Sequence, residues 1–398
     1  MADHTDSSSP LKRHRLLAPS AAVLVSPLCL GGMNFGDAWK SKLGECDKGT
    51  TFEILDTFYE LGGNFVDTSN NYQAEESETW IGEWLSRHPN RRDEMVIATK
   101  YAEDWKTYSG PHLVQSNYGG NSAKSLHVSV AASLKKLQTT YIDLLYVHFW
   151  DYTATVEEVM TSLNVLVNQG KVLYLGICNT PAWVVVKCNE FARRHGLRPF
   201  SVYQGRWSAA ERDLERDVIP MCNAEGMAIA PWGALGGGYF KPSQKITNPS
   251  EGEEDGGRTL TSLTVGTEAQ VSVVLETIAQ DRSQPMTSIA LAYIMQKTPY
   301  VFPIVGGRKV SHLRSNVEAM KITLTDVEIH KIDAAYNFQP GFPHNVISGN
   351  RLPKGPEDIS LTQIRGSFDF VEGQRPIVPN KGNSILESGG DLEDKTLA

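Results

Sequence analysis

The feature that most constrains the fold is the regular alternation of short apolar runs with helix-like segments. The eight runs that resemble buried strands are 25–31, 64–67, 94–100, 142–148, 171–178, 199–204, 226–232 and 300–306. Helices are expected among them at 50–61, 75–86, 121–136, 155–169, 182–195, 268–280, 286–297 and 310–319. Short apolar strands that alternate with helices indicate a parallel sheet covered on both faces.

Eight such strands are the number that closes a (β/α)8 TIM barrel, an α/β fold in which functional residues follow the carboxyl ends of the strands. The competing architecture, a doubly wound sheet, normally has a Gly-x-Gly-x-x-Gly turn after an early strand. The first apolar run ends in "GGMNFG", whose glycines lack that spacing. Gly62, Gly170 and Gly196 lie where helices are expected to end. We therefore expect a single-domain barrel.

Both ends of the chain and two long connections fall outside the alternating pattern. We expect a flexible N-terminal segment at 1–20, the barrel at 21–345 and a C-terminal extension at 346–398 with a disordered end. The connections 101–120 and 241–266 are long, and such segments are usually lids, binding loops or disordered stretches.

Charge and cysteine usage limit the partners and the compartment. The formal charge of −8 and the lack of a Lys/Arg cluster argue against nucleic-acid binding. No apolar run reaches the roughly 18 residues of a membrane span, and the polar N-terminus does not resemble a signal peptide. The five scattered cysteines suit free thiols in a reducing compartment. We expect a cytoplasmic protein, monomeric or homo-oligomeric, without a nucleic-acid or membrane partner.

Three chemically active residues end successive predicted strands. Asp67 ends the second strand, Lys100 the third and His148 the fourth, while Tyr72 follows in the loop after the second strand. Because the carboxyl ends of barrel strands meet at one mouth, we expect the four side chains to converge. Each alone has an ordinary structural explanation as a cap, a packing residue, a surface charge or a core histidine. Their joint occurrence favours one shared site.

These residue types meet the demands of carbonyl reduction. Hydride transfer builds negative charge on the carbonyl oxygen, which needs a donor of a proton and of hydrogen bonds. A tyrosine has an ordinary pKa of about 10. A lysine beside it lowers that pKa, and a carboxylate keeps the buried lysine charged. A histidine can orient the carbonyl as a second donor.

The motifs around these residues resemble those of the aldo-keto reductases. The family's Asp, Tyr, Lys and His tetrad matches "VDTSNNY", "IATKY" and "LLYVHFWD", and the resemblance covers roughly residues 20 to 345. "TPAWVV", "APWGALGGGYF" and "PIVGGRKVSHLRSNVEA" resemble the branch of fungal aryl-alcohol dehydrogenases and norsolorinic acid reductases. The resemblance implies an NADPH-dependent reductase of an aldehyde or ketone, aromatic or polyketide-like, in fungal secondary metabolism, with Tyr72 as the proton donor.

The resemblance also implies where the nicotinamide nucleotide binds. Asp67, Cys178, Asn179 and Gln204 would lie beside the nicotinamide, and Trp232 would stack on its ring. Many relatives carry serine where Cys178 stands. A loop with little side-chain bulk would let backbone N–H groups approach the pyrophosphate. That loop consists of Gly233, Ala234, Leu235, Gly236, Gly237 and Gly238.

A basic motif near the last strand favours NADP(H) over NAD(H). Arg308, His312 and Asn316 are spaced by four residues, so a helix that begins here would place them on one face. Helix N-termini favour anions, and arginine can grip a phosphate with two hydrogen bonds. This face would suit the 2′-phosphate.

The substrate site is expected at aromatic residues around the mouth. With His148, we expect Tyr101, Trp105 and Trp150 to contact a flat, apolar or aromatic carbonyl compound. Their alternative role is to pack the 101–120 loop against the barrel.

Two other functions fit parts of the pattern. The first is a nucleotide-sensing regulatory subunit of the potassium-channel β-subunit type, which shares the fold and has little turnover. The second is a metal-dependent barrel hydrolase with Asp67 and His148 as ligands. It would need more ligands, and the other strand ends carry Lys100, Asn179, Gln204 and Trp232, which are poor ones. We therefore expect no metal.

Overall fold

The computed structural model describes residues 9–107, 114–240, 265–349, 351–353, 355–367, 369–370 and 373–377. Eight parallel strands form one sheet in the order β10-β3-β4-β5-β6-β7-β8-β9. The strands are β3 (Cys29–Gly31), β4 (Phe65–Asp67), β5 (Val96–Tyr101), β6 (Ile142–Val147), β7 (Val172–Cys178), β8 (Phe200–Arg206), β9 (Ala228–Trp232) and β10 (Ile304–Val305). Each lies within or overlaps one of the predicted apolar runs.

The two edges of this sheet meet and close the barrel. Ile229 of β9 forms a parallel bridge with Val301, shortly before β10. The Ile229 N–H donates to Tyr300 O and the Phe302 N–H donates to Ile229 O, both at 2.9 Å. Neighbouring strands follow one another in the chain, whereas a doubly wound sheet reverses its strand order. The (β/α)8 barrel is thus confirmed.

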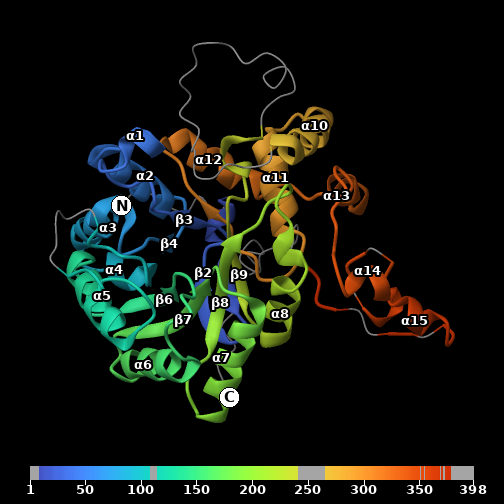
Figure 1. Ribbon diagram of the computed structural model, residues 1–398. Helices are drawn as coiled ribbons and strands as arrows, with labels where there is room; N and C mark the ends of the chain where they lie inside the picture. Colours follow the sequence, from blue (N-terminus) through green and yellow to red (C-terminus); the bar gives the residue numbers. More distant parts are fainter. Residues whose placement is uncertain are drawn as a thin grey trace, which may run out of the picture.

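Helices surround the strands on the outside, as Figure 1 shows. The long helices are α2 (Lys48–Glu60), α3 (Glu76–Ser86), α5 (Ala123–Lys136), α6 (Val156–Asn168), α7 (Ala182–Arg194), α10 (Val265–Asp281), α11 (Met286–Met295) and α12 (Val310–Ala319). All eight match predicted helices. Gly62, Gly170 and Gly196 have φ angles of 92°, 66° and 66°, as a helix-ending glycine requires.

The sequence-based prediction missed two helices of eight residues each, α8 (Val218–Glu225) and α13 (Asp326–Asp333), and several shorter ones. Pro220 lies in the first turn of α8, where the missing N–H costs little. Helix α13 begins with a capping box in which Thr325 and Glu328 exchange hydrogen bonds. Shorter helices are α1 (Lys40–Leu43), α4 (Arg91–Glu94), α14 (His344–Ile347) and α15 (Ser360–Gln363).

The N-terminal part differs from the flexible segment expected at 1–20. From Pro10 onward it is folded, with β1 (Arg15–Ala18) and β2 (Ala21–Val25) paired as an antiparallel hairpin. Leu17 and Val25 are fully buried against the first residues of the barrel strands, such as Phe65. The physical reason is that these apolar side chains cover the amino-terminal end of the barrel, which would otherwise be open to water.

Alternate side chains along each strand enter two different cores. Val96 and Ala98 of β5 point into the barrel, whereas Ile97 and Tyr101 pack between the sheet and the helices. Lys100 follows the same two-residue period and therefore points inward, like Ala98. This alternation decides which residues at the strand ends can reach the mouth.

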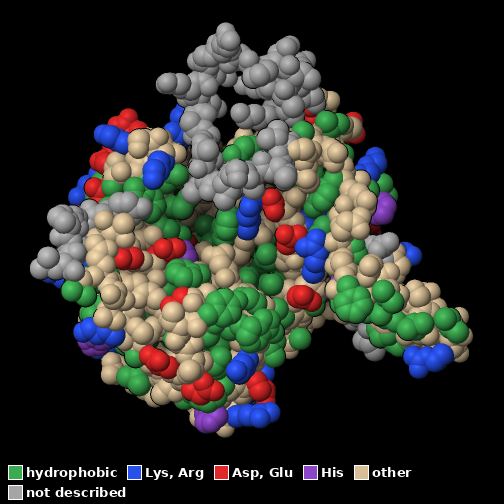
Figure 2. All heavy atoms as spheres, viewed as in Figure 1, with side chains coloured by type: hydrophobic (Ala, Val, Ile, Leu, Met, Phe, Trp, Pro, Cys, Tyr) green, Lys and Arg blue, Asp and Glu red, His purple; other side chains and the backbone are tan. Residues whose placement is uncertain are grey.

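The C-terminal arm, which carries α14 and α15, projects from the barrel on the right of Figure 1. Figure 2 shows apolar side chains along this arm, and Phe342, Leu361 and Ile364 are exposed. None of the helices in the described part of the chain is long and apolar enough to cross a membrane. Most of the 241–266 connection and the end of the tail lie outside the described residues.

Candidate active site

The centre of the site is a buried lysine with three hydrogen-bond acceptors. Lys100 Nζ donates to Asp67 Oδ1 at 2.5 Å, to Thr68 O at 2.8 Å and to Tyr72 Oη at 3.1 Å. The lysine side chain is 0% exposed. An ammonium group has three donors, so all of them are used. Burial by itself lowers the pKa of Lys100, but the nearby Asp67 carboxylate raises it above its ordinary value, so the ammonium stays charged.

Tyr72 is held against this lysine by a turn of unusual backbone geometry. Gln73, Ala74 and Glu75 have φ angles of 52°, 50° and 83°, a region that non-glycine residues rarely occupy. The Gln73 side chain fixes the turn, because its Oε1 accepts from Trp39 N at 2.6 Å and its Nε2 donates to Met33 O at 2.9 Å. Backbone strain of this kind persists where surrounding contacts enforce it.

The Tyr72 hydroxyl remains protonated in this environment. Burial raises the pKa of Tyr72, and this outweighs the lowering by the Lys100 charge. The net direction is opposite to the one that the lysine alone led us to expect, because the hydroxyl is removed from water. The hydroxyl accepts a hydrogen bond from Lys100 and keeps its own proton, which suits a proton donor.

His148 follows β6 and faces Tyr72 across the mouth. The centroids of the two rings are 6.0 Å apart in an edge-to-face arrangement. Burial, and then the Lys100 charge, hold the pKa of His148 well below its usual range, so the imidazole is neutral. Its Nδ1 lies 3.3 Å from Ser69 Oγ. Among the described residues no hydrogen bond to the other ring nitrogen, Nε2, is formed, so this nitrogen can interact with a ligand.

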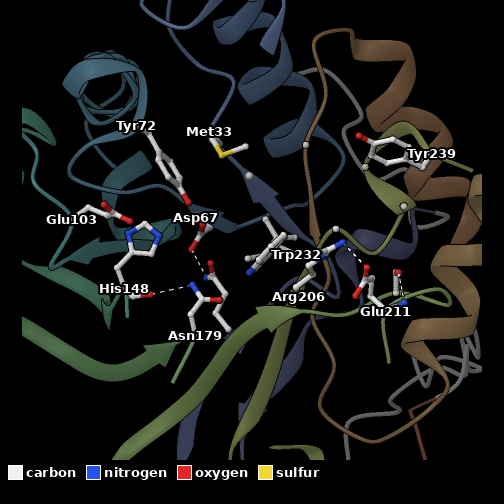
Figure 3. A pocket seen from close by; sticks show the side chains of 18 of the residues that line it. Met33, Asp67, Tyr72, Glu103, His148, Asn179, Arg206, Glu211, Trp232 and Tyr239 are labelled. Carbon is white, nitrogen blue, oxygen red and sulfur yellow. Dashed lines mark hydrogen bonds and ion pairs between the residues drawn. The ribbon is translucent and has the colours of Figure 1, made fainter. Parts of the chain in front are cut away.

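A cavity of about 350 Å³ lies over these groups, and Figure 3 shows its lining. Tyr72, Glu103 and His148 are at one end, while Arg206, Glu211 and Tyr239 are at the other. Trp232 and Asn179 lie between the two ends (Figure 3). The volume is within the range of small-molecule sites, which is roughly 300–1,000 Å³.

The middle of the cavity contains most of the residues predicted to hold the nicotinamide. Asn179, Gln204 and Trp232 line it together with Asp67. Gln204 Nε2 donates to Asp67 Oδ2 at 2.9 Å, and Asn179 Nδ2 donates to His148 O at 3.1 Å. The flat indole ring and the two amides fit a nicotinamide, whose ring has a flat face for stacking and whose carboxamide is both a donor and an acceptor.

The glycine-rich loop after β9 lines the cavity in part. Gly233, Gly236 and Gly237 contribute to its surface, with φ angles of 75°, 74° and 60°. Such angles favour glycine and bring the backbone to the cavity surface, as a pyrophosphate site requires. Ala234 is buried and Leu235 packs against the core, so neither belongs to the lining, and neither does Gly238.

Cys178 is also excluded from the cavity surface. Its side chain is 0% exposed and packs inside the barrel with Cys29 and Tyr146. Burial raises the pKa of the thiol well above its ordinary value. Cys178 ends β7 with its side chain buried inside the barrel, so it does not line the cavity as we expected.

The basic motif near the last strand has a different geometry from the predicted one. Helix α12 begins at Val310 with Lys309 as its N-cap, so Arg308 precedes the helix. Its guanidinium lies against Gly44, where an added Cβ would be 1.6 Å from Arg308 Nη1. His312 is exposed, Asn316 is buried, and none of the three lines the cavity. His312 and Asn316 thus have the predicted spacing within α12, whereas the placement of Arg308 on the same helical face is wrong.

The aromatic residues predicted for the substrate do not line the cavity either. Tyr101 follows Lys100, so the strand alternation turns its side chain away from the barrel and into the outer core. Trp105 packs edge-on against Tyr118, with ring centroids 5.6 Å apart. Trp150 is buried in the same outer core. The structure thus shows the alternative role, in which these aromatic side chains pack against other parts of the protein.

Other residues take their place in the lining. Met33 and Trp39 lie in the loop after β3, and Trp39 meets Tyr72 edge-to-face with centroids 6.3 Å apart. Functional residues of a barrel follow the carboxyl ends of all its strands, so the loop after β3 could have been considered on the same ground as the later loops. Arg206 lies two residues after Gln204 and also reaches the cavity, where it forms a 2.6 Å ion pair with Glu211.

The described part of the chain contains no cluster of side chains that resembles a metal centre. No three His, Cys, Asp or Glu side chains gather there in a way that could hold a metal ion. The cation that pairs with the Asp67 carboxylate is the Lys100 ammonium group.

The sequence profile of the Aldo/keto reductase family matches residues 27–337. The chain belongs to the aldo/keto reductase family. This confirms the resemblance seen in the tetrad motifs, and the protein is accordingly an oxidoreductase. As in other barrel enzymes, the site is built at the carboxyl ends of the strands.

Its relatives include several fungal members of this family. An aryl-alcohol dehydrogenase of Pestalotiopsis microspora is 52% identical over 97% of this chain and 98% of its own. Norsolorinic acid reductase B of Dothistroma septosporum is 51% identical over 95% of this chain and 97% of its own. The aryl-alcohol dehydrogenase (NADP(+)) of Phanerodontia chrysosporium is 47% identical over 93% of this chain and 97% of its own. The similarity to this fungal branch thus extends over nearly the whole chain.

Proposed function

We propose that this aldo/keto reductase uses NADPH to reduce an aromatic or polyketide-like aldehyde or ketone to an alcohol. The observation that carries the proposal is the position of Lys100, which bonds Asp67 and Tyr72 at the base of the cavity that Trp232 and Asn179 also line. The proposed proton donor and the proposed nicotinamide site therefore lie in the same cavity.

The cavity has the groups that a nicotinamide nucleotide needs. Trp232 would lie against the nicotinamide ring, and the amides of Asn179 and Gln204 would bond its carboxamide. The backbone at Gly236 and Gly237 would approach the pyrophosphate. NADPH supplies the hydride when it is bound. The choice of NADP(H) over NAD(H) is supported by the NADP(+) in the name of the Phanerodontia relative.

Within this site, Tyr72 would give its proton to the substrate oxygen. Lys100 lies 3.1 Å from the hydroxyl and would stabilise the tyrosinate that remains. Asp67 neutralises and orients the ammonium group. The neutral His148 would donate a hydrogen bond from its free ring nitrogen to the same oxygen and so orient the carbonyl.

An aromatic substrate is supported by the cavity wall and by the relatives. Met33, Trp39 and Tyr72 offer an apolar and aromatic surface at the end that contains His148. The relatives' names refer to aryl alcohols and to norsolorinic acid. On this basis we propose a role in fungal secondary metabolism.

A turnover assay tests the proposal. Purified full-length protein is mixed with a panel of aromatic aldehydes and polyketide ketones, and consumption of NADPH or NADH is followed. We expect turnover with at least one compound and faster reaction with NADPH. Tight cofactor binding without turnover of any compound would contradict the proposal and favour a regulatory subunit.

A further inference from the structure

One carboxylate of the cavity has no part in the proposed reaction. Glu103 lines the end that also contains Tyr72 and His148, and Figure 3 shows its side chain on that side, away from Trp232. Among the described residues, no hydrogen bond or ion pair involves the Glu103 carboxylate. Of the other acids that line the cavity, Asp67 and Glu211 are bonded to Lys100 and Arg206 respectively. Glu268 also lines the cavity, and its Oε2 has no partner among the described residues, but its side chain is only 4% exposed and so offers little surface to a ligand.

The backbone holds Glu103 in a defined place. The preceding Ala102 has a φ angle of 103°, which an alanine adopts only when its surroundings require it. Ala102 O accepts from Gly120 N at 2.7 Å, and Glu103 O accepts from Asn70 Nδ2 at 3.5 Å. An added Cβ at Gly119 would come within 3.1 Å of Ala102 O. These contacts fix the segment against its neighbours and direct the carboxylate to the cavity.

The surroundings of the Glu103 carboxylate disfavour its charged form. Burial raises the pKa of Glu103, and the adjacent Asp104 carboxylate adds to this shift. The two basic residues nearest in the sequence are paired with other acids, Lys100 with Asp67 at 2.5 Å and Lys106 with Glu75 at 2.7 Å. A half-buried carboxylate without a donor is costly, and a hydrogen bond from a bound ligand offsets this cost.

We propose that Glu103 accepts a hydrogen bond from a hydroxyl group of the substrate, so that the enzyme selects hydroxylated aromatic aldehydes and ketones. This inference rests on the proposed carbonyl reductase function. The proposed partner of Glu103 is a neutral hydroxyl donor. A cationic substituent is the competing partner for a carboxylate, and the experiment below distinguishes the two. Trp39 and Met33 supply the apolar surface for the ring that carries the hydroxyl.

The experiment compares hydroxybenzaldehydes with the matching methoxybenzaldehydes, which keep the oxygen but cannot donate. The full-length wild type, Glu103→Gln and Asp104→Asn are assayed with NADPH. Asp104 is the matched control, because it is the neighbouring carboxylate and does not line the cavity. We expect the wild type to prefer the hydroxylated compounds in kcat/KM. Glu103→Gln should reduce this preference by about tenfold, the size of a lost hydrogen bond to a charged group.

The reduced preference should come mainly from a higher KM for the hydroxylated aldehyde, since the bond forms in both the ground and the transition state. Asp104→Asn should keep the wild-type preference. If Glu103→Gln is poorly folded in thermal unfolding, Glu103→Ala takes its place. An unchanged preference in the Glu103 variant, or the same loss in Asp104→Asn, would overturn the inference. So would a preference for a trimethylammonium-substituted aldehyde. Failure of the proposed function is distinct, because then the methoxy compounds are not reduced either.

Discussion

Gln204 Nε2 donates a hydrogen bond to Asp67 Oδ2 at 2.9 Å, although the two residues are 137 positions apart in the sequence. This bond connects the predicted nicotinamide site to the carboxylate that orients Lys100. Both residues are at least 95% buried, at 4% and 3% exposure. The proposed cofactor contact and the position of Asp67 therefore involve the same amide.

Replacement of Gln204 should affect both properties at once. In Gln204→Ala the Asp67 oxygen loses a buried donor, so we expect the free energy of unfolding to fall by about 1–3 kcal/mol. The affinity for NADPH should fall as well. The matched control is Gln296→Ala, a buried glutamine that bonds the backbone of Ile322 and Leu324. It should lose similar stability in urea unfolding but keep the wild-type Kd for NADPH.

A substitution in the glycine-rich loop separates backbone strain from ligand contact. Gly237 has a φ angle of 60° and lines the cavity, so Gly237→Ala should cost on the order of 1 kcal/mol and weaken NADPH binding. Gly170 has a similar φ angle of 66° at the end of α6, with nothing within 4 Å of an added Cβ. Gly170→Ala should cost similar stability with no change in NADPH affinity. Equal affinities in the two variants would show that the loop does not contact the nucleotide.

The neutral His148 predicts how stability depends on pH. Its pKa is lowered in the folded state, whereas an unfolded histidine has a pKa of about 6.5. Below that pH the unfolded chain binds a proton that the folded protein does not, so stability is lost as the pH falls. His148→Gln should remove part of the loss between about pH 6.5 and pH 5 in urea unfolding. His127→Gln, at an exposed position of α5, is the control and should keep the wild-type slope.

Much of the fold and of the tetrad could be predicted because the signals are local. Each strand is a short apolar run, and Asp67, Lys100 and His148 stand at the ends of such runs. The alternation of side chains along a strand could also have shown that Tyr101 does not reach the mouth. A side chain next to the inward-pointing Lys100 has to point outward, which excludes it from the mouth.

The remainder of the site depends on contacts between distant segments. Gln73 bonds the backbone of Met33 and Trp39, and this brings the first loop to the tetrad. The position of Arg308 against Gly44 likewise depends on how α12 meets the loop before α2. A spacing of four residues predicts a helical face only where the helix has already begun. Such contacts leave no periodic pattern in the sequence.

The central claim is that Tyr72 gives its proton to the substrate, and Tyr72→Phe tests it most directly. The variant keeps the ring that meets Trp39 and His148 but loses the hydroxyl beside Lys100. Single-turnover reduction of an aromatic aldehyde is measured together with the Kd for NADPH. We expect an unchanged Kd and a rate lower by roughly 10²–10⁴-fold, the usual contribution of a general acid. A rate close to that of the wild type, with NADPH bound normally, would contradict the claim.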